Sequence, residues 1–282
     1  MQLSARFLID KAKICYNSGT VAYLYETHLH TAGVSKCAGS GGADYITGYK
    51  DKGYSGIIVT DHFYNGYNAI PQDLPWKEWV NRFCRGYEEA REEGEKQGLD
   101  VFFGWEETFD SHDDYLVYGL DKQWLLEHPE VKTWTRAEQY HAVKAAGGCV
   151  VQAHPFRQRD YIKCIALSIG CVDAVEAANA SNEASEDALA YRYAKKIGKP
   201  IIAGSDIHNA SGIYTGEIFG VYLKNKPKNI IDFAKAVCNN EITGVKINPT
   251  RFDFYGYENI TLPIEIRGSG DNIISDSLND YI

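Results

Sequence analysis

The sequence contains no apolar run long enough to cross a membrane. Near the N-terminus, the apolar residues Phe7 to Ile9 are followed at once by Asp10 and Lys11, which predicts neither a signal peptide nor a membrane anchor. The seven cysteines are scattered and include no CxxC pair, so we expect reduced thiols rather than disulfide bonds. These absences predict a cytoplasmic protein with no membrane partner.

The sequence also lacks an excess of basic residues. It has 29 Lys and Arg against 38 Asp and Glu, a net charge of −9, and no local basic run. Such a chain has no overall positive field to attract a phosphate backbone, so we expect no nucleic-acid polymer as partner. The 282 residues are 44% hydrophobic and 13% aromatic, enough for a sizeable core. No repeat or linker divides them, which predicts one domain spanning residues 1–282.

Short apolar runs alternate with segments of helical period, the pattern of βα units. The predicted strands are residues 23–28, 56–61, 101–106, 114–120, 149–154, 174–179, 200–206 and 218–223, and the predicted helices are 43–52, 76–97, 135–146, 183–197 and 228–239. This count favours a parallel α/β fold, a TIM-like or distorted (β/α) barrel, over a doubly wound sheet. The barrel core is predicted at about 23–223, with 224–282 as a C-terminal extension packed on it.

Five of the eight histidines lie at the carboxyl ends of predicted strands, together with acidic residues. They are His28 and His30 in HLH, His62 after Asp61 in TDH, His154 in AHPFR, and His208 after Asp206 in GSDIH. Glu106 in GWE ends the third predicted strand, residues 101–106. In a parallel barrel, all strand carboxyl ends open on one face, so these side chains are expected to share a pocket. Imidazoles beside carboxylates suit zinc, manganese or iron, and the number of donors predicts two or three divalent ions.

The ordered motifs HLH, TDH, GWE, AHPFR and GSDIH resemble those of the PHP (polymerase and histidinol phosphatase) family. The resemblance covers about residues 23–223 and implies a distorted (β/α)7 barrel that holds two or three metal ions and hydrolyses phosphate esters. It implies that His28, His30, Glu106 and Asp206 bind one ion, Glu106 and His154 a second, and His62 and His208 a third.

Several positions stay open in the sequence. Where the family often has another ligand after HxH, this chain offers Ser35, Lys36 or Cys37, and before the fourth strand it offers His112, Asp113 or Asp114. Asp61 is expected either to bind metal or to orient a neighbouring histidine. Arg157 is the predicted phosphate ligand, with Lys36 and Arg159 as weaker candidates.

The motifs therefore predict a metal-dependent phosphoesterase that hydrolyses a small phosphorylated metabolite or nucleotide through a metal-bound hydroxide, with Glu106, Asp206 and His154 as catalytic residues. One alternative is an amidohydrolase-like metal hydrolase, although no lysine stands at a strand end to bridge two ions. Another is a metal-stabilised binding module without catalytic activity. Turnover of phosphate esters, turnover of amides or lactones, and metal binding without turnover distinguish the three.

Overall fold

The structure of the chain is a computed structural model that describes residues 22–248, 250–254 and 260–282. The predictions for Phe7 to Lys11 lie outside these residues. The strands are β1 (Tyr23–Glu26), β2 (Gly56–Val59), β3 (Asp100–Phe103), β4 (Trp105–Thr108), β5 (Asp114–Tyr118), β6 (Cys149–Gln152), β7 (Ile165–Ser168), β8 (Ala174–Asn179), β9 (Ile201–Gly204), β10 (Gly220–Leu223), β11 (Ile242–Lys246), β12 (Ile264–Arg267) and β13 (Ile273–Ser275).

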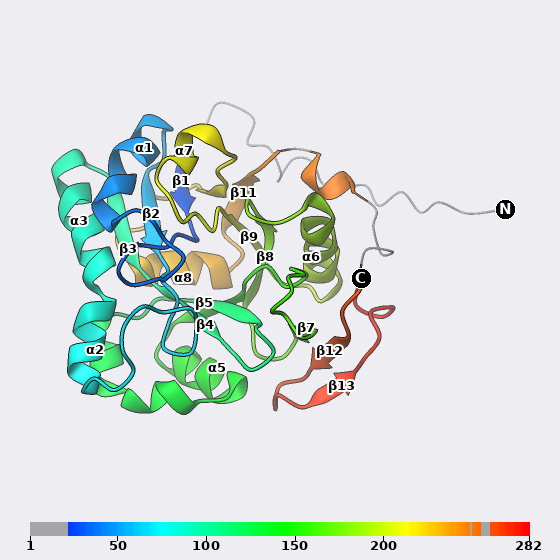
Figure 1. Ribbon diagram of the computed structural model, residues 1–282. Helices are drawn as coiled ribbons and strands as arrows, with labels where there is room; N and C mark the ends of the chain where they lie inside the picture. Colours follow the sequence, from blue (N-terminus) through cyan, green and yellow to red (C-terminus); the bar gives the residue numbers. More distant parts are fainter. Residues whose placement is uncertain (1–21, 249, 255–259) are drawn as a thin grey trace.

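The α-helices are α1 (Ile46–Asp51), α2 (Trp76–Phe83), α3 (Arg85–Gln97), α4 (Lys122–Glu127), α5 (Arg136–Ala145), α6 (Ala184–Lys196), α7 (Gly212–Thr215) and α8 (Ile230–Cys238). The 3-10 helices are η2 (Gly42–Tyr45), η3 (Pro129–Thr133) and η4 (Arg251–Asp253). Helices surround the central strands, whereas the β12–β13 hairpin lies at one side of the molecule (Figure 1). The predicted α/β class is confirmed.

The described strands form two five-stranded sheets, ordered β11-β10-β1-β2-β3 and β4-β5-β6-β8-β9, and a three-stranded sheet, β13-β12-β7. Isolated bridges link the two larger sheets, between Leu29 and Ile207 and between His62 and Glu106. Among the described residues these bridges replace continuous ladders, so a closed TIM barrel is not what the strands form. Both bridges include or adjoin the strand-end residues singled out in the sequence.

The prediction that all these strands run parallel is wrong for two of them. β5 runs antiparallel to both β4 and β6, and β10 runs antiparallel to β1. Only residues 109–113 join β4 to β5, too few for the crossover of a dozen or more residues that a parallel connection requires. The sequence pattern contains no helix at this point, and that absence was the available signal.

Two predicted elements are each divided in the structure. The strand predicted at 101–106 consists of β3 and β4, separated at Gly104, where an added Cβ would lie 2.8 Å from the Val117 carbonyl oxygen. The helix predicted at 76–97 consists of α2 and α3, separated at Cys84. Just after this break, the backbone at Gly86 packs directly against Thr31, close to the strand ends.

The core contains a cluster of stacked and edge-on aromatic rings between α2 and the strands. Phe63 lies at the centre, with ring centroids 5.2 Å from Trp79, 5.1 Å from Phe83 and 5.5 Å from Trp105. Such contacts add to the stabilisation from burying these large side chains. The cluster fixes the segment after β2, which carries His62, against β4, which carries Glu106.

Within the part of the chain that the structure describes, no helix is both long enough and apolar enough to cross a bilayer.

Gly204 ends β9 in close contact with His28 and Glu176, and we expect Gly204→Ala to destabilise the protein by about 1–3 kcal/mol through overpacking. An added Cβ would lie 2.6 Å from the His28 Cβ and 2.7 Å from the Glu176 Oε1. Urea denaturation measures the change in free energy of unfolding. In the control Gly41→Ala, the nearest atom is 3.5 Å away. Equal losses in the two variants would contradict the packing described here.

Candidate metal centre

The structure brings the strand-end histidines and carboxylates into one buried cluster. The histidines and Asp206 follow the carboxyl ends of β1, β2, β6 and β9, whereas Glu106 is the second residue of β4 and not, as predicted, the end of a strand. The donor atoms form three groups, and within each group the atoms lie within 4.8 Å of one another. These groups are His28, Glu106 and His154; His28, His30 and Asp206; and His30, His62 and His208.

Glu106 lies at the centre of the cluster and is 1% exposed. Its Oε1 is 3.2 Å from His28 Nε2 and 3.1 Å from His154 Nε2. Its Oε2 is 2.7 Å from His62 Nδ1 and 3.5 Å from His30 Nε2. One carboxylate therefore faces imidazoles from three different strand ends, an arrangement suited to bridging two ions.

Asp206 faces the same space from the end of β9. Its Oδ1 is 3.0 Å from His30 Nε2 and 3.6 Å from His28 Nε2, and its Oδ2 is 2.7 Å from Arg157 Nη2. The Asp206 backbone has φ of 52°, and His154 has φ of 27°, values that residues with a Cβ seldom adopt. Strained backbone of this kind is found at functional sites, where surrounding contacts hold it.

The donor atoms of the cluster fit a divalent cation. Among the described residues, His28 Nε2, His30 Nε2, His62 Nδ1 and Glu106 Oε2 are buried and have no hydrogen-bond partner with acceptable geometry. Buried polar atoms are normally satisfied, and four buried donors without hydrogen-bond partners around one point are suited to binding a cation together. Imidazole nitrogens with carboxylate oxygens suit zinc, manganese or iron.

The charges of the cluster depend on one another. Burial opposes ionisation of Glu106, but His28 and His62 hold the pKa of this carboxyl well below its usual value. Burial likewise disfavours the charged form of His28, yet Glu176, Asp206 and Glu106 raise its pKa well above the usual value. Burial and the neighbouring His62 and His208 lower the pKa of His30 well below its usual value. The negative charges thus require nearby positive charge, which cations can supply.

Glu176 is a site residue that the motifs did not reveal. It lies fully buried in β8, with Oε1 3.0 Å from His28 Nδ1, while its Oε2 accepts a hydrogen bond from the His154 backbone N–H at 3.1 Å. The contact with Nδ1 turns Nε2 of His28 towards Glu106, as carboxylates behind metal-binding histidines do. A lone carboxylate within the apolar strand AVEAAN was the sequence signal for it.

Ser35 has a similar position behind His30. Its Oγ lies 3.2 Å from His30 Nδ1 and donates a hydrogen bond to Asp61 Oδ1 at 2.7 Å. Asp61 also accepts hydrogen bonds from the Thr31 backbone N–H and hydroxyl. Burial raises the pKa of Asp61 to about 6. Asp61 thus contacts His30 through Ser35, consistent with the orienting role considered for it.

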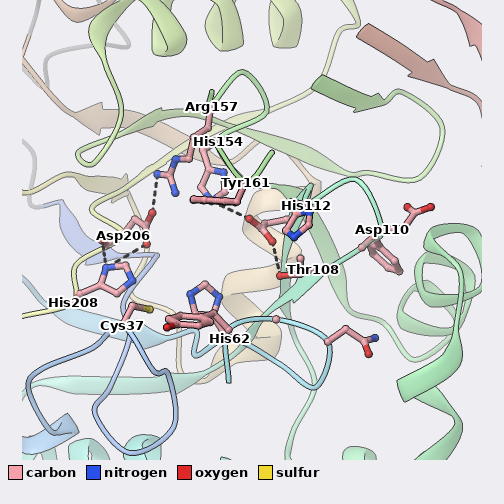
Figure 2. Close-up of a pocket in the computed structure, with 15 residues that line it drawn as sticks. Cys37, His62, Thr108, Asp110, His112, His154, Arg157, Tyr161, Asp206 and His208 are labelled. Carbon is pink, nitrogen blue, oxygen red and sulfur yellow. Dashed lines mark hydrogen bonds and ion pairs between the residues drawn. The ribbon is translucent and has the colours of Figure 1, made fainter. Parts of the chain in front are cut away.

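A cavity of about 960 Å³ opens beside the cluster and is lined by His62, Asp114, His154, Arg157, Asp206 and His208 among others. Figure 2 shows Arg157 and His154 on one side of the cavity and His208, Cys37 and His62 on another. Burial raises the pKa of the Cys37 thiol, but hydrogen bonds with His208 and His62 outweigh this and lower it to about 7.

Arg157 lies at this cavity but is not a free side chain. Besides contacting Asp206, it donates hydrogen bonds from Nε to Asn182 Oδ1 at 2.8 Å and from Nη2 to Asn179 Oδ1 at 3.0 Å. These contacts fix the guanidinium at the cavity wall. Arg159 instead pairs with Glu186 at 2.9 Å and is absent from the cavity lining, while Lys36 lies over the Tyr67 ring at 5.5 Å.

The open choice between His112, Asp113 and Asp114 is narrowed by geometry. Asp114 Oδ2 is 3.7 Å from His154 Nε2, and burial raises the pKa of Asp114 to about 6. His112 also lines the cavity, with its ring centroid 6.0 Å from that of Tyr161, but it belongs to none of the three donor groups (Figure 2). Asp113 instead pairs with Arg136, and His128 stacks on Trp124, both outside the cluster.

Solved structures of similar fold include a protein with a predicted PHP-like phosphoesterase domain. A two-domain Bacteroides vulgatus protein containing a predicted PHP-like metal-dependent phosphoesterase matches with a TM-score of 0.59 and 17% identity, over 82% of this chain and 66% of that chain. PsfC from Pseudomonas syringae matches with a TM-score of 0.53 and 16% identity, over 82% and 94%. The lesion-specific endonuclease PfuEndoQ from Pyrococcus furiosus matches with a TM-score of 0.50 and 13% identity, over 78% and 56%.

These likenesses confirm the predicted resemblance at the level of the fold. This chain spans a little under two thirds of the Bacteroides protein and about half of the endonuclease. No family model matches the sequence, and no curated protein matches it.

The exclusion of a nucleic-acid polymer as partner is wrong. An endonuclease, an enzyme that cleaves nucleic acid, shares this fold. The exclusion rested on the net charge of the whole chain, whereas bound cations are the largest local charges in a metal site and determine its sign. An acidic surface elsewhere therefore does not exclude a polyanionic substrate.

We expect Glu176→Gln to weaken metal binding about 10- to 100-fold, because the amide would no longer orient His28 as a carboxylate does. Competition with a chromophoric chelator measures the affinity. The matched control is Glu107→Gln in β4: Glu107 is equally buried, burial raises its pKa well above the usual value, and its neighbour is Asn65 rather than a histidine. Equal affinities for the two variants would rule out the orienting contact.

Proposed function

We propose that this chain is a metal-dependent phosphoesterase that hydrolyses a small phosphorylated metabolite or nucleotide. The observation that carries the proposal is the position of Glu106, whose two oxygens face four imidazoles at 2.7 to 3.5 Å. Two ions sharing a carboxylate are a recurrent arrangement for hydrolysis of phosphate esters. The similar fold of the Bacteroides protein with a predicted PHP-like phosphoesterase supports the same reaction class.

The metal ligands we propose follow the three groups of donors. His28, His30, Glu106 and Asp206 would hold one ion, and Glu106 with His154 would hold a second, to which Asp114 is close enough to contribute. His62 and His208 would hold a third, with the Cys37 thiol beside them. The bridges at Leu29 and His62 join the two larger sheets, and as the framework we propose a single domain in which a distorted (β/α)7 barrel is closed only in part.

Bound divalent ions would supply Lewis-acid activation and neutralise the charge that develops on the phosphoryl oxygens. The side chains of the protein position the reactants. Arg157, held by Asp206, Asn182 and Asn179, places a fixed positive charge at the wall of the cavity, where it would face a phosphoryl oxygen. Glu176 and Ser35 keep the ligand imidazoles in one orientation, so little rearrangement is needed when substrate binds.

The mouth of the cavity carries two exposed aromatic residues, Tyr67 and Tyr161, which are 60% and 58% exposed. Exposed tyrosine rings at a site for phosphate esters are suited to stacking on a planar group. This favours a nucleotide or an aryl phosphate over a purely aliphatic phosphate. We propose that the planar group of the substrate stacks on the exposed ring of Tyr161.

We expect Glu106→Ala and His154→Ala to lose bound metal and to lower phosphate release by more than about a hundredfold. Losing a metal ligand should reduce metal affinity more than losing a residue such as Glu176, which only orients a ligand. Elemental analysis gives the metal content. A panel of monoesters, diesters and short single-stranded oligonucleotides gives the activity. The control is His141→Ala, an exposed histidine on α5. Full activity in either ligand variant would overturn the proposal.

The same panel tests the alternatives. Turnover confined to amides or lactones would indicate an amidohydrolase-like enzyme. Bound metal without turnover of any substrate would indicate a binding module.

Tyr161→Ala tests the stacking surface. Loss of one stacking contact is expected to raise KM for a nucleoside monophosphate about tenfold while leaving KM for glycerol phosphate unchanged. Steady-state kinetics on both substrates separates these effects, and Tyr214→Ala, also an exposed tyrosine but outside the cavity, is the control. A parallel rise in KM for both substrates would contradict stacking.

A further inference from the structure

A second cluster of reactive side chains lies at the end of β6 remote from the metal centre. Cys149 is the first residue of β6, whereas His154 lies two residues beyond the last, about 16 Å farther along an extended chain. Cys238 ends α8, and Asp173 lies just before β8. The Sγ atoms of both cysteines and an Asp173 oxygen lie within 4.8 Å of one another.

Lys144 of α5 completes this cluster. Its Nζ lies 3.5 Å from Cys238 Sγ and 3.0 Å from Asp173 Oδ1, and it donates a hydrogen bond to the Gly148 carbonyl at 3.3 Å. An ammonium group beside a thiol stabilises the thiolate, the reactive form. Cys238 is half-buried, which leaves it open to small molecules, and Cys149 is fully buried.

The same donors could be taken for a metal site, but the contacts favour another use. Asp173 Oδ2 already accepts a hydrogen bond from the Val150 N–H at 3.0 Å. Its Oδ1 accepts a hydrogen bond from the Tyr140 hydroxyl at 3.3 Å and also forms the ion pair with Lys144. The lysine thus supplies the positive charge that a metal ion would supply. What remains is a pair of neighbouring thiols.

We propose that Cys149 and Cys238 form a reversible disulfide, with Cys238 as the attacking thiol and Cys149 as the resolving one. The partner is a low-molecular-weight disulfide of the glutathione type. The Cys238 thiolate attacks one of its sulfurs, a mixed disulfide forms, and one small thiolate leaves and takes a proton. The Cys149 thiol then loses its proton, attacks Cys238 Sγ, and releases the second small thiol. The small disulfide is reduced to two thiols as the two cysteines are oxidised.

The acidities of the two thiols match these roles. A hydrogen bond with Cys149, aided by Lys144, lowers the pKa of Cys238 to about 7 against the opposing effects of burial and Asp173. Burial raises the pKa of Cys149 well above its usual value. Cys238 is therefore the thiol more readily ionised, and Cys149 reacts only when the mixed disulfide is next to it. The bond would join the C-terminus of α8 to the start of β6, on which α8 packs.

The test incubates the full chain with glutathione mixtures of increasing oxidised fraction, alkylates the remaining thiols, and maps peptides without reduction. We expect a Cys149–Cys238 peptide pair and loss of two of the seven thiols, reversed by excess reduced glutathione. Cys149→Ser should retain glutathione on Cys238, and Lys144→Gln should slow the reaction about tenfold, the effect of one pKa unit on the thiolate fraction. Cys84→Ser, a buried cysteine outside the cluster, should still form the pair.

No cross-linked pair at any glutathione ratio, in protein whose circular dichroism shows it folded, would overturn the proposal. Loss of one equivalent of bound zinc in Cys238→Ser, the half-buried position, would also overturn it and indicate a metal site instead. Neither outcome depends on phosphoesterase activity. An oxidised pair that forms equally fast in Lys144→Gln would contradict the activation by lysine.

Discussion

The structure depends on keeping the Glu106 carboxylate ionised inside the protein. A buried carboxylate is costly unless charges or hydrogen bonds compensate it closely. Here the compensation comes from His28, His62 and His154, each within 3.2 Å of a Glu106 oxygen and each from a different strand end. The strands can meet this requirement only in one register, because a slip by one residue would turn the side chains to the opposite face. The need to compensate the Glu106 charge therefore also restricts the register of the strands that carry these side chains.

This link explains why the sequence predicted the cluster better than the sheets. A histidine after an apolar run can be recognised from local sequence alone, and the period of two in HLH places His28 and His30 on one side. Strand direction is not local. The antiparallel β5 follows from a short connection, and the antiparallel β10 follows from its pairing with β1, which no pattern within residues 218–223 reveals. The sequence could thus predict the α/β class and not the arrangement of its sheets.

The supporting roles of two residues were missed for a related reason. Glu176 and Ser35 lie behind the histidines, and their importance is a matter of distance to His28 and His30 rather than of any spacing along the chain. The positions that departed from the PHP pattern illustrate the same limit. Ser35, Lys36 and Cys37 were equal candidates in sequence, yet Ser35 supports a histidine, Lys36 stacks on Tyr67 and Cys37 lies in the cavity.

The shared contacts also determine how the site responds to change. Glu176 holds both the His28 ring and the His154 backbone, and Asp206 faces His28, His30 and Arg157. The positive φ angles at His154 and Asp206 persist only because such contacts outweigh the strain. Removing one of these contacts would therefore have two effects: one interaction is lost, and the strained backbone can relax. Residues linked in this way do not contribute additively, so the donors of the cluster act as one unit whose geometry is set by all its members.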